Sequence, residues 1–418
     1  MIPVKLAARF VEGTVRAASS VRSEAPMYLQ ETTEQRALRT TLRDYFRALM
    51  TPEVIRALRD DGESGPARRR VLRQMGTDGM LGIGWPKEYG GQGRPATDQF
   101  IFFDEAQRAQ APLPFVTLNT VGPTLIEYGT DEQKQSYLPR ILAGEIVFAI
   151  GYSEPSAGTD LASLSTRAVR DGEQWVINGQ KIFTSGADGA DYVWLACRTN
   201  PDVKKHRGIS IIIVPTASPG FSSTPITTVG NPTTTSTYYD EVRVPVGNLV
   251  GDENGGWKLI TTQLNHERVG LAALSARAFE LYDAVVEWAA TTDSGEDALM
   301  IDLPWVQAEL ATCRAKLEAM YLLNWRMTLD VGRGQLKPQT SSSVKVFGTE
   351  ATADVYHRLL NILGPEAHLR SGKGPAPIDG EVEAMGRTAQ INTFGGGVNE
   401  VQREIVAWVG LGMTRVSR

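Results

Sequence analysis

Cysteine, histidine and long apolar runs are scarce in this sequence. Two cysteines, Cys197 and Cys313, and four histidines occur among the 418 residues. Two cysteines cannot build a disulfide framework and suit a reducing compartment, and neither has a histidine or second cysteine at metal-ligand spacing. No apolar run is long enough to cross a bilayer, and a net charge of −5 argues against a surface that neutralises nucleic-acid phosphates. These absences argue against a disulfide-stapled, metal-binding, membrane-spanning or nucleic-acid-binding protein.

The length and composition fit a globular protein with more than one packed unit. Hydrophobic residues make up 42% of the chain and charged residues 22%, which is ordinary for such proteins. A chain of 418 residues exceeds the size at which one core keeps growing, so two or three units are expected. Residues 1–26 stand apart as a leader rich in basic residues and serine. Within it, residues 1–24 resemble an organelle transit peptide, which would direct the protein to the mitochondrial matrix. The alternative is a disordered or mis-started leader ahead of Met27 on a cytoplasmic protein.

Hydrophobic periodicity divides the remaining chain into three parts. Over residues 27–145 apolar residues recur at three- and four-residue steps, Leu42 and Phe46 among them, as one buried helix face requires. Over 146–255 the period changes to two, and over 256–418 the helical period returns. The sequence therefore predicts an α+β fold. It consists of an N-terminal helical domain, a small β-barrel domain in the middle and a C-terminal four-helix bundle.

Turn signals predict where the strands of the middle domain begin and end. Asn178-Gly179 lies between β-branched and aromatic residues and predicts a hairpin turn, and Asp171-Gly172 predicts another tight turn. Three apolar or alternating runs that end at breakers predict strands over 190–197, 208–215 and 238–244.

Two segments of the middle domain combine glycine and proline with small hydroxyls. Tyr152-Ser-Glu-Pro-Ser-Ala-Gly-Thr-Asp160 and Asn178-Gly-Gln-Lys-Ile-Phe-Thr-Ser185 can lay N–H groups and hydroxyls against a flat, acceptor-rich ligand. In order and spacing the pair resembles the flavin-contacting signature of the acyl-CoA dehydrogenase family. The resemblance covers residue 31 to the C-terminus, including the helical, β, helical order. It implies FAD as cofactor, an acyl-CoA thioester as substrate and an electron-transfer flavoprotein as electron acceptor.

An acid interrupts the apolar face of the first C-terminal helix. Glu267 lies three residues after Leu264 and four before Leu271, so it falls on the face of those leucines. An ionised acid on a buried face is costly unless it is paired. Glu267 could pair with Arg268 or Arg277, lie at the helix edge in water, or be held there for chemistry.

The family resemblance favours the chemical explanation. Acyl-CoA dehydrogenases remove an α-proton with a glutamate whose pKa is raised in an apolar pocket, while the β-hydrogen leaves as hydride to flavin N5. Most members carry this glutamate in the loop before the last helix, where this chain has Gly396. A minority carry it on the helix that here contains Asn265-His-Glu-Arg268. The resemblance therefore implies that Glu267 is the base, with Arg268 beside it in the catalytic group. Glu400 begins a helix and is interpreted as a favourable partner of the helix dipole.

The same resemblance assigns the FAD contacts. Tyr152 and Ser153 correspond to residues that approach the pyrimidine end of the isoalloxazine. Phe183 stands where many members have a tryptophan flanking the ring, and its alternative role is simple hairpin packing. Ser185 corresponds to a threonine that reaches the N5 side. The complete implied set is Tyr152, Ser153, Gly158, Phe183, Thr184, Ser185 and Asn399.

Two substrate contacts are implied as well. Thr159 corresponds to a hydroxyl near the CoA pantetheine. The Gly396 N–H could donate to the thioester oxygen and stabilise the enolate that develops. Glycines at 395–397 leave room for a branched or ring-bearing acyl group.

One element of the family is missing from the sequence. Many members hold the ADP half of a neighbour's FAD with an Arg-x-Thr-Phe-Gly segment, but residues 289–297 contain three acids and no arginine. Acids at this place would repel a pyrophosphate. The chain therefore resembles the base-bearing subunit of actinobacterial α2β2 acyl-CoA dehydrogenases of steroid side-chain breakdown. In those enzymes a distinct second subunit supplies the ADP-binding residues.

Two other functions stay open on the sequence. The same fold could let the reduced flavin meet oxygen, as an oxidase or monooxygenase. The chain could also be a non-catalytic partner subunit. The missing ADP-binding segment favours this last alternative, and the intact signature segments and Glu267 argue against it.

Overall fold

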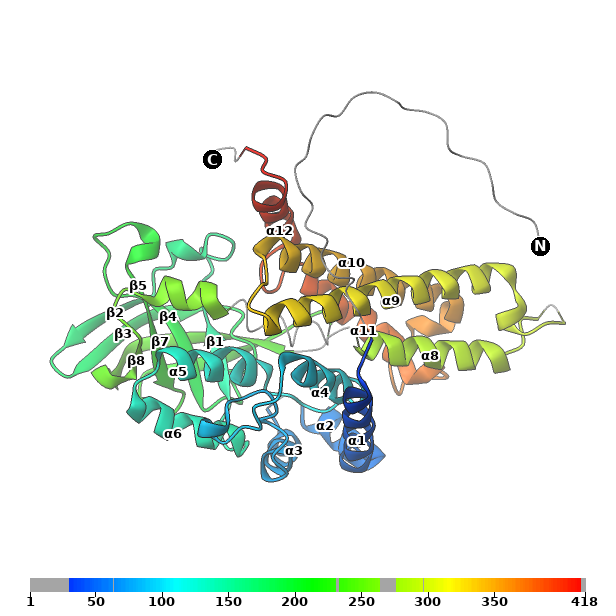
Figure 1. The fold of residues 1–418 in the computed structure, drawn as a ribbon, viewed down its shortest axis with the longest axis horizontal. Coiled ribbons are helices and arrows are strands. Elements are labelled where there is room, and N and C mark those ends of the chain that lie inside the picture. Colours follow the sequence, from blue (N-terminus) through cyan, green and yellow to red (C-terminus); the bar gives the residue numbers. More distant parts are fainter. Residues whose placement is uncertain (1–29, 63, 231–232, 264–275, 296, 415–418) are drawn as a thin grey trace.

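The computed structural model describes residues 30–62, 64–230, 233–263, 276–295 and 297–414. The predicted leader and the predicted catalytic pair Glu267 and Arg268 lie outside the described residues. A first group of helices, a mixed sheet and a second group of helices follow one another along the chain (Figure 1).

The first part of the described chain is helical. Leu42 and Phe46 of α1 are buried, and the Phe46 ring packs on Phe102 with centroids 5.7 Å apart, so the predicted helix face is confirmed. Thr32 and Thr130 form capping boxes at the starts of α1 and α6, which fixes where these helices begin. The α-helices are α1 (Thr33–Leu49), α2 (Pro52–Asp61), α3 (Pro66–Thr77), α4 (Ala96–Arg108), α5 (Gly122–Tyr128) and α6 (Asp131–Leu142).

The middle part is an eight-stranded mixed sheet. The strand order is β6-β7-β3-β2-β4-β5-β8, and β1 pairs with β4 in parallel. The strands are β1 (Phe148–Gly151), β2 (Arg167–Asp171), β3 (Gln174–Lys181), β4 (Tyr192–Arg198), β5 (Ile209–Pro215), β6 (Phe221–Thr227), β7 (Thr233–Pro245) and β8 (Leu249–Val250). The predicted turn at Asp171-Gly172 is confirmed, since Asp171 pairs with Gln174 across it.

The hairpin turn predicted at Asn178-Gly179 is wrong. Both residues lie inside β3, where the pairing with β7 shifts register between Ile177 and Gly179. A Cβ on Gly179 would lie 2.6 Å from Thr166 Oγ1, and Gly179 has a φ of 145°. The glycine serves a bulge and a close backbone approach, which in sequence resembles a turn.

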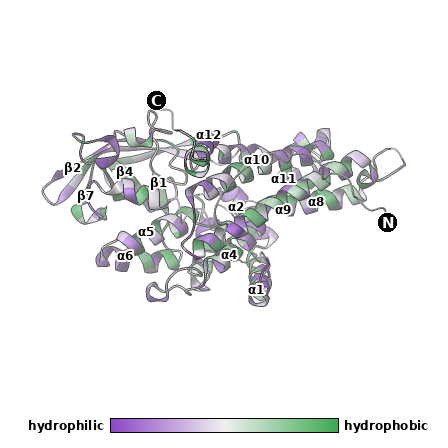
Figure 2. Cartoon of the chain, turned by 45° about the horizontal axis from the view of Figure 1, so that its top comes forward, coloured by the Kyte–Doolittle hydropathy of each residue, from purple (hydrophilic) through white to green (hydrophobic). Residues whose placement is uncertain are grey.

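The last part is helical again. A helix begins at Gly256, and its described residues run to Gln263. It is followed by α8 (Ala276–Thr291), α9 (Pro304–Gly332), α10 (Pro338–Leu363), α11 (Glu381–Ala389) and α12 (Asn399–Ile405). Helix α10 contacts α8, α9, α11 and α12, and apolar faces of α8, α9, α10 and α11 share one core. Figure 2 shows hydrophobic and hydrophilic residues alternating around the helices, as such packing requires.

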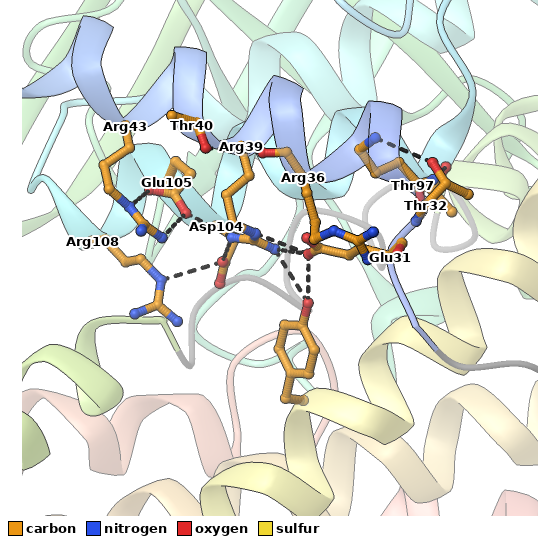
Figure 3. Close-up of polar contacts among 12 residues, drawn as sticks. Glu31, Thr32, Arg36, Arg39, Thr40, Arg43, Thr97, Asp104, Glu105 and Arg108 are labelled. Atoms are coloured by element: carbon orange, nitrogen blue, oxygen red, sulfur yellow. Dashed lines mark hydrogen bonds and ion pairs between the residues drawn. The ribbon is translucent and has the colours of Figure 1, made fainter.

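Buried charges join the two helical parts. Arg39 of α1 forms an ion pair with Asp104 of α4, whose side chain is 2% exposed, and donates to Tyr321 Oη of α9 at 3.2 Å (Figure 3). Burial alone would lower the pKa of Arg39, but the Asp104 carboxylate raises it overall. Arg108 Nη1 extends the contact to Glu280 Oε1 of α8 at 2.6 Å. Because removing one partner of a buried pair is strongly destabilising, the Arg39–Asp104 pair fixes α1 against α4. The contacts of Arg39 with Tyr321 and of Arg108 with Glu280 connect these two helices to α9 and α8.

Candidate active site

A buried ion pair joins the two signature segments. Lys181, the last residue of β3, donates from Nζ to Glu154 Oε1 at 2.8 Å and to the Tyr152 carbonyl at 3.0 Å. The side chains of Lys181 and Glu154 are 0% and 2% exposed. The Ile182 N–H also donates to the Ser153 carbonyl at 2.9 Å. The structure therefore brings the 152–160 segment and the end of β3 together.

The Glu154 carboxylate also binds the chain at residues 165 and 166. Its Oε2 accepts from the Ser165 N–H and hydroxyl, both at 2.7 Å, and its Oε1 accepts from the Thr166 N–H at 2.8 Å. Burial would raise the pKa of Glu154, but Lys181 and these donors outweigh burial and lower it to about 2. Glu154 is therefore ionised throughout the neutral range, and its carboxylate acts as a structural anchor. Sequence reasoning missed this pair, although both residues stand inside the quoted motifs.

Tyr152 connects the first signature segment to the helix that begins at Gly256. Its hydroxyl is hydrogen-bonded to Gln263 Oε1 and accepts from Trp194 Nε1 at 3.2 Å. Gln263 is 1% exposed. The predicted flavin contact Tyr152 is thus fixed at its carbonyl by Lys181 and at its hydroxyl by two buried side chains.

The second signature segment ends in an unusual conformation. Phe183 has a φ of 61°, which is strained for an aromatic residue, and its side chain is 63% exposed. The alternative that Phe183 simply packs in a hairpin is therefore wrong. The neighbouring Thr184 N–H donates to the Thr235 carbonyl at 2.8 Å, and Ser185 Oγ lies 2.8 Å from Thr234 Oγ1. Bonds to β7 thus hold this segment in place while the aromatic ring remains uncovered.

The neighbourhood of these segments fits a flavin. Two fully buried side-chain atoms there, Gln263 Nε2 and Thr235 Oγ1, have no hydrogen-bond partner within the part of the chain that the structure describes. A buried polar atom without a partner costs about 1–3 kcal/mol, so a ligand that satisfies it is favoured. An amide donor, a hydroxyl and an exposed aromatic ring suit an acceptor-rich, flat ring system such as an isoalloxazine.

The last three residues of the first segment, 158–160, lie on the surface. Gly158 and Thr159 are exposed, and a Cβ on Gly158 would meet no atom within 4 Å. Next to them Lys205 Nζ forms an exposed ion pair with Asp160 Oδ2 at 2.9 Å. The predicted CoA contact of Thr159 thus has open surroundings, and it stays a prediction.

The glycine loop, residues 393–399, forms a second candidate region. Gly396 is exposed and has a φ of 65°, and a Cβ there would meet no atom within 4 Å. Asn399 is 3% exposed, and its amide bonds Lys345 Nζ at 2.6 Å, Thr349 Oγ1 at 3.1 Å and Glu350 Oε1 at 3.0 Å. The side chain of Asn399 is therefore committed to α10, and its implied FAD contact would have to come from its backbone.

A small pocket opens beside Ser185. It encloses about 200 Å³ between the start of α3, the segment before α5 and the segment after β3. Its lining is mainly apolar, including Phe115 and Phe148, with Arg68 and Arg69 at one side. The pocket adjoins the second signature segment and can hold an apolar group of modest size.

Comparisons with known proteins agree with this arrangement. Models of the acyl-CoA dehydrogenase N-terminal, middle and C-terminal domains match residues 32–145, 149–242 and 254–411. Acyl-CoA dehydrogenase FadE26 of Mycobacterium tuberculosis is 52% identical over 404 residues, covering 94% of this chain and 100% of FadE26. FadE29 of the same organism is 48% identical over 397 residues, with 94% and 100% coverage.

Solved structures give the same result. The Tcur3481-Tcur3483 steroid ACAD is 56% identical with a TM-score of 0.89, covering 93% of this chain and 100% of the matched chain. The ChsE4-ChsE5 complex of Mycobacterium tuberculosis is 53% identical with a TM-score of 0.88, again with 93% and 100% coverage.

A β domain between two helical parts, with two joined flavin-type segments, defines a flavoenzyme. The chain belongs to the acyl-CoA dehydrogenase family. It is accordingly an FAD-dependent oxidoreductase that dehydrogenates acyl-CoA thioesters, and the predicted fold class, cofactor and enzyme class are confirmed. Among the described residues, no helix is long and apolar enough to cross a membrane.

Proposed function

We propose that Glu267 removes the α-proton of a bulky acyl-CoA thioester, with Arg268 beside it in the catalytic group. The observation that carries this proposal is the commitment of Glu154 to Lys181. A general base for this reaction needs a pKa near neutrality, whereas the pKa of Glu154 is lowered to about 2. Glu154, the buried carboxylate of the flavin signature, is therefore excluded as the base.

The glycine loop offers no substitute. Its residues 393–399 include no acid, and Gly396 stands where most family members have the base. Glu400 follows the loop but is exposed at the start of α12, where it favourably meets the helix dipole. Glu267 is the acid that the sequence puts on an apolar helix face, where burial raises a carboxyl pKa.

The described residues contribute binding and orientation. Lys181 and Glu154 hold the Tyr152 backbone, and bonds from β7 hold Thr184 and Ser185. Bound FAD supplies the acceptor for the β-hydride. Phe183 would flank the ring of the bound cofactor, and Thr159 would meet the CoA pantetheine. The Gly396 N–H donates to the thioester oxygen, which lowers the pKa of the α-proton by stabilising the enolate.

The open space above Gly396 supports a bulky or ring-bearing acyl group, because no described side chain fills it. One similar solved protein adds support, since the Tcur3481-Tcur3483 protein is described as a steroid ACAD. We therefore infer a steroid side-chain CoA thioester as the substrate class.

We further propose a distinct second subunit in an α2β2 assembly. Residues 289–295 and 297 contain no arginine that could hold an ADP pyrophosphate, and two similar solved proteins are two-protein assemblies. The electron acceptor is an electron-transfer flavoprotein. The enzyme works in the cytoplasm, where both free cysteines would stay reduced.

Replacement of the base tests the proposal in the assembled protein with its partner subunit. Glu267→Gln is expected to lower kcat by about 10²–10⁴-fold, because a general base contributes that much, while FAD content stays unchanged. Glu287→Gln, at an exposed acid of α8, is the matched control and should retain wild-type turnover. Near-normal turnover by Glu267→Gln would refute the assignment and favour a non-catalytic subunit.

A fully FAD-loaded, active homotetramer of this chain alone would refute the distinct partner. Rapid reoxidation of the reduced flavin by oxygen would instead favour the oxidase or monooxygenase alternative.

A further inference from the structure

One lysine binds the glycine loop at three points. Lys345 of α10 donates from Nζ to the Thr393 carbonyl at 3.1 Å, the Gly397 carbonyl at 2.7 Å and Asn399 Oδ1 at 2.6 Å. A lysine ammonium has three N–H donors, so these acceptors use all of them. The three acceptors lie at both ends of the loop. The single Nζ atom of Lys345 therefore holds the two ends together.

The loop itself has little else to define its shape. Residues 394–397 are exposed, and the Gly395 N–H makes a local bond to the Ile391 carbonyl at 2.8 Å. Gly396 and Gly397 have φ values of 65° and 96°, which glycine adopts without strain but at a high cost in backbone entropy. A segment of this composition needs an external contact to keep one conformation.

The lysine is itself supported from two helices. Asn399 is one of its three acceptors, and the amide nitrogen of Asn399 donates to Thr349 and Glu350 of α10. Glu350 in turn accepts from Arg403 of α12 at 2.6 Å. These contacts fix the Asn399 side chain relative to α10. Lys345 therefore holds the loop in a defined position against this helix.

We propose that Lys345 is a positioning residue for the dehydrogenation, which fixes the peptide that presents the Gly396 N–H to the thioester oxygen. The inference rests on the proposed function, because the role of Gly396 belongs to it. Lys345 acts through the loop and does not contact substrate. A donor to a developing oxyanion is effective only when it is held in place before the reaction, so loosening the loop reduces catalysis more than binding.

The charge of Lys345 makes this contact dependent on pH. Burial lowers the pKa of Lys345 to about 8, although Glu400 and Glu350 oppose the shift. The charged groups around it are Glu350 on its own helix and Glu400 and Arg403 on α12. Above this pH the neutral amine has two N–H donors for three acceptors, so one loop contact is lost. Global stability should not fall with it, because a lowered lysine pKa means that the folded state releases the proton first.

The test compares Lys345→Met with Lys316→Met in the assembled, FAD-containing protein. Lys316 is a matched control, because its Nζ pairs with Asp354 of α10 at 2.6 Å and its side chain is 34% exposed. Hydrogen exchange of residues 391–402 and steady-state kinetics with octanoyl-CoA and cholanoyl-CoA are measured. Lys345→Met should exchange faster in the loop and lose about 10–100-fold in kcat with a smaller change in KM, at unchanged FAD content.

Loop exchange and kcat that match the Lys316→Met control would overturn the inference. If the wild-type protein turned over neither thioester, the proposed function would fail, while the exchange data would still decide whether Lys345 holds the loop. Lys345→Arg covers the case in which Lys345→Met does not fold. The guanidinium does not titrate in this range, so Lys345→Arg should lack the decline in kcat near pH 8 that is expected of the wild type. A decline that persists in Lys345→Arg would overturn the role of Lys345.

Discussion

Two lysines hold the two halves of the candidate active site in different ways. Lys181 is fully buried and pairs with the Glu154 carboxylate beneath the flavin signature. Lys345 is partly buried and bonds two carbonyls and an amide oxygen in the glycine loop. One contact is an ion pair sealed from water, and the other is a charged donor serving neutral acceptors.

The difference matches what each half has to do. The flavin side must bind a ring system that stays in place, and a sealed ion pair gives a fixed anchor whose loss is costly. The loop side must hold an N–H donor in place beside an acyl group that enters and leaves, and three bonds from one partly buried ammonium position the loop without a sealed ion pair. Substitutions in the flavin half should therefore mainly lower the stability of the protein, and substitutions in the loop half should mainly lower its turnover.

Breaking the buried pair should give the largest effect. Lys181→Met leaves Glu154 buried without its partner and is expected to destabilise the protein by about 3–5 kcal/mol, with loss of FAD. The free energy of unfolding in urea and the flavin absorbance measure both effects. Lys205→Met is the control, because the Lys205–Asp160 pair is 63% exposed on both sides and such pairs contribute little.

A double variant, Glu154→Met with Lys181→Met, sharpens this prediction. Removing both charges leaves no uncompensated ion, so more than half of the lost stability should return. A double variant that is as unstable as Lys181→Met would show that the hydrogen bonds from residues 165 and 166 matter more than the charge.

Low pH should remove the stabilising contribution of the Glu154 carboxylate. Its pKa is lowered to about 2 from an ordinary value of 4.5, so its stabilising contribution is complete above 4.5 and is lost as pH falls through about 2. Glu154→Gln lacks that contribution. The difference in Tm between wild type and Glu154→Gln should therefore be largest above pH 5 and shrink between pH 4.5 and 3. A difference that does not change over this range would contradict the assignment.

Asn399→Ala tests the loop half at a smaller scale. The change removes one of three Lys345 acceptors and is expected to cost about 1–2 kcal/mol, with faster exchange in the loop and unchanged FAD content. Asn178→Ala serves as a control, since Asn178 is a strand asparagine bonded to Glu241 far from the loop. Loss of FAD in Asn399→Ala alone would support a cofactor contact by its side chain.

Gly396→Asn should have the smallest effect on stability. Asparagine tolerates a φ of 65°, and the space above Gly396 is open, so the cost should be under about 1 kcal/mol. Gly397→Asn should cost more, because a Cβ there would lie 2.7 Å from Gln402 Nε2. If the open space receives the acyl group, Gly396→Asn slows cholanoyl-CoA more than octanoyl-CoA. Equal slowing of both thioesters would contradict that use of the space.

Local patterns in the sequence predicted much of the fold. The face of Leu42 and Phe46 and the turn at Asp171-Gly172 follow from rules that act over a few residues, and both are confirmed. Asn178-Gly179 misled because a bulge that approaches Thr166 uses the same residue types as a turn. Strand β6 was not predicted, because Phe221–Thr227 is rich in Ser, Thr and Pro and its pairing with β7 decides its conformation.

The sequence led to candidate ligand contacts, which stay predictions, but not to the contacts that the site residues make with one another. The resemblance identified Tyr152 and Ser185 as ligand contacts, but it said nothing of what holds them. Lys345 meets Thr393 across 48 positions, and no spacing rule connects a helix lysine to distant carbonyls. Contacts of this kind depend on the completed fold.

The two thiols are both out of reach of solvent. Cys197 and Cys313 are each 0% exposed, and burial raises the pKa of both to about 12. Thiol reagents that act on accessible thiolates should therefore leave the folded chain untouched. A single cysteine placed at the partly exposed Ile391 would then carry a fluorophore or spin label at one defined position. The label would then report whether the neighbouring loop keeps one conformation during turnover.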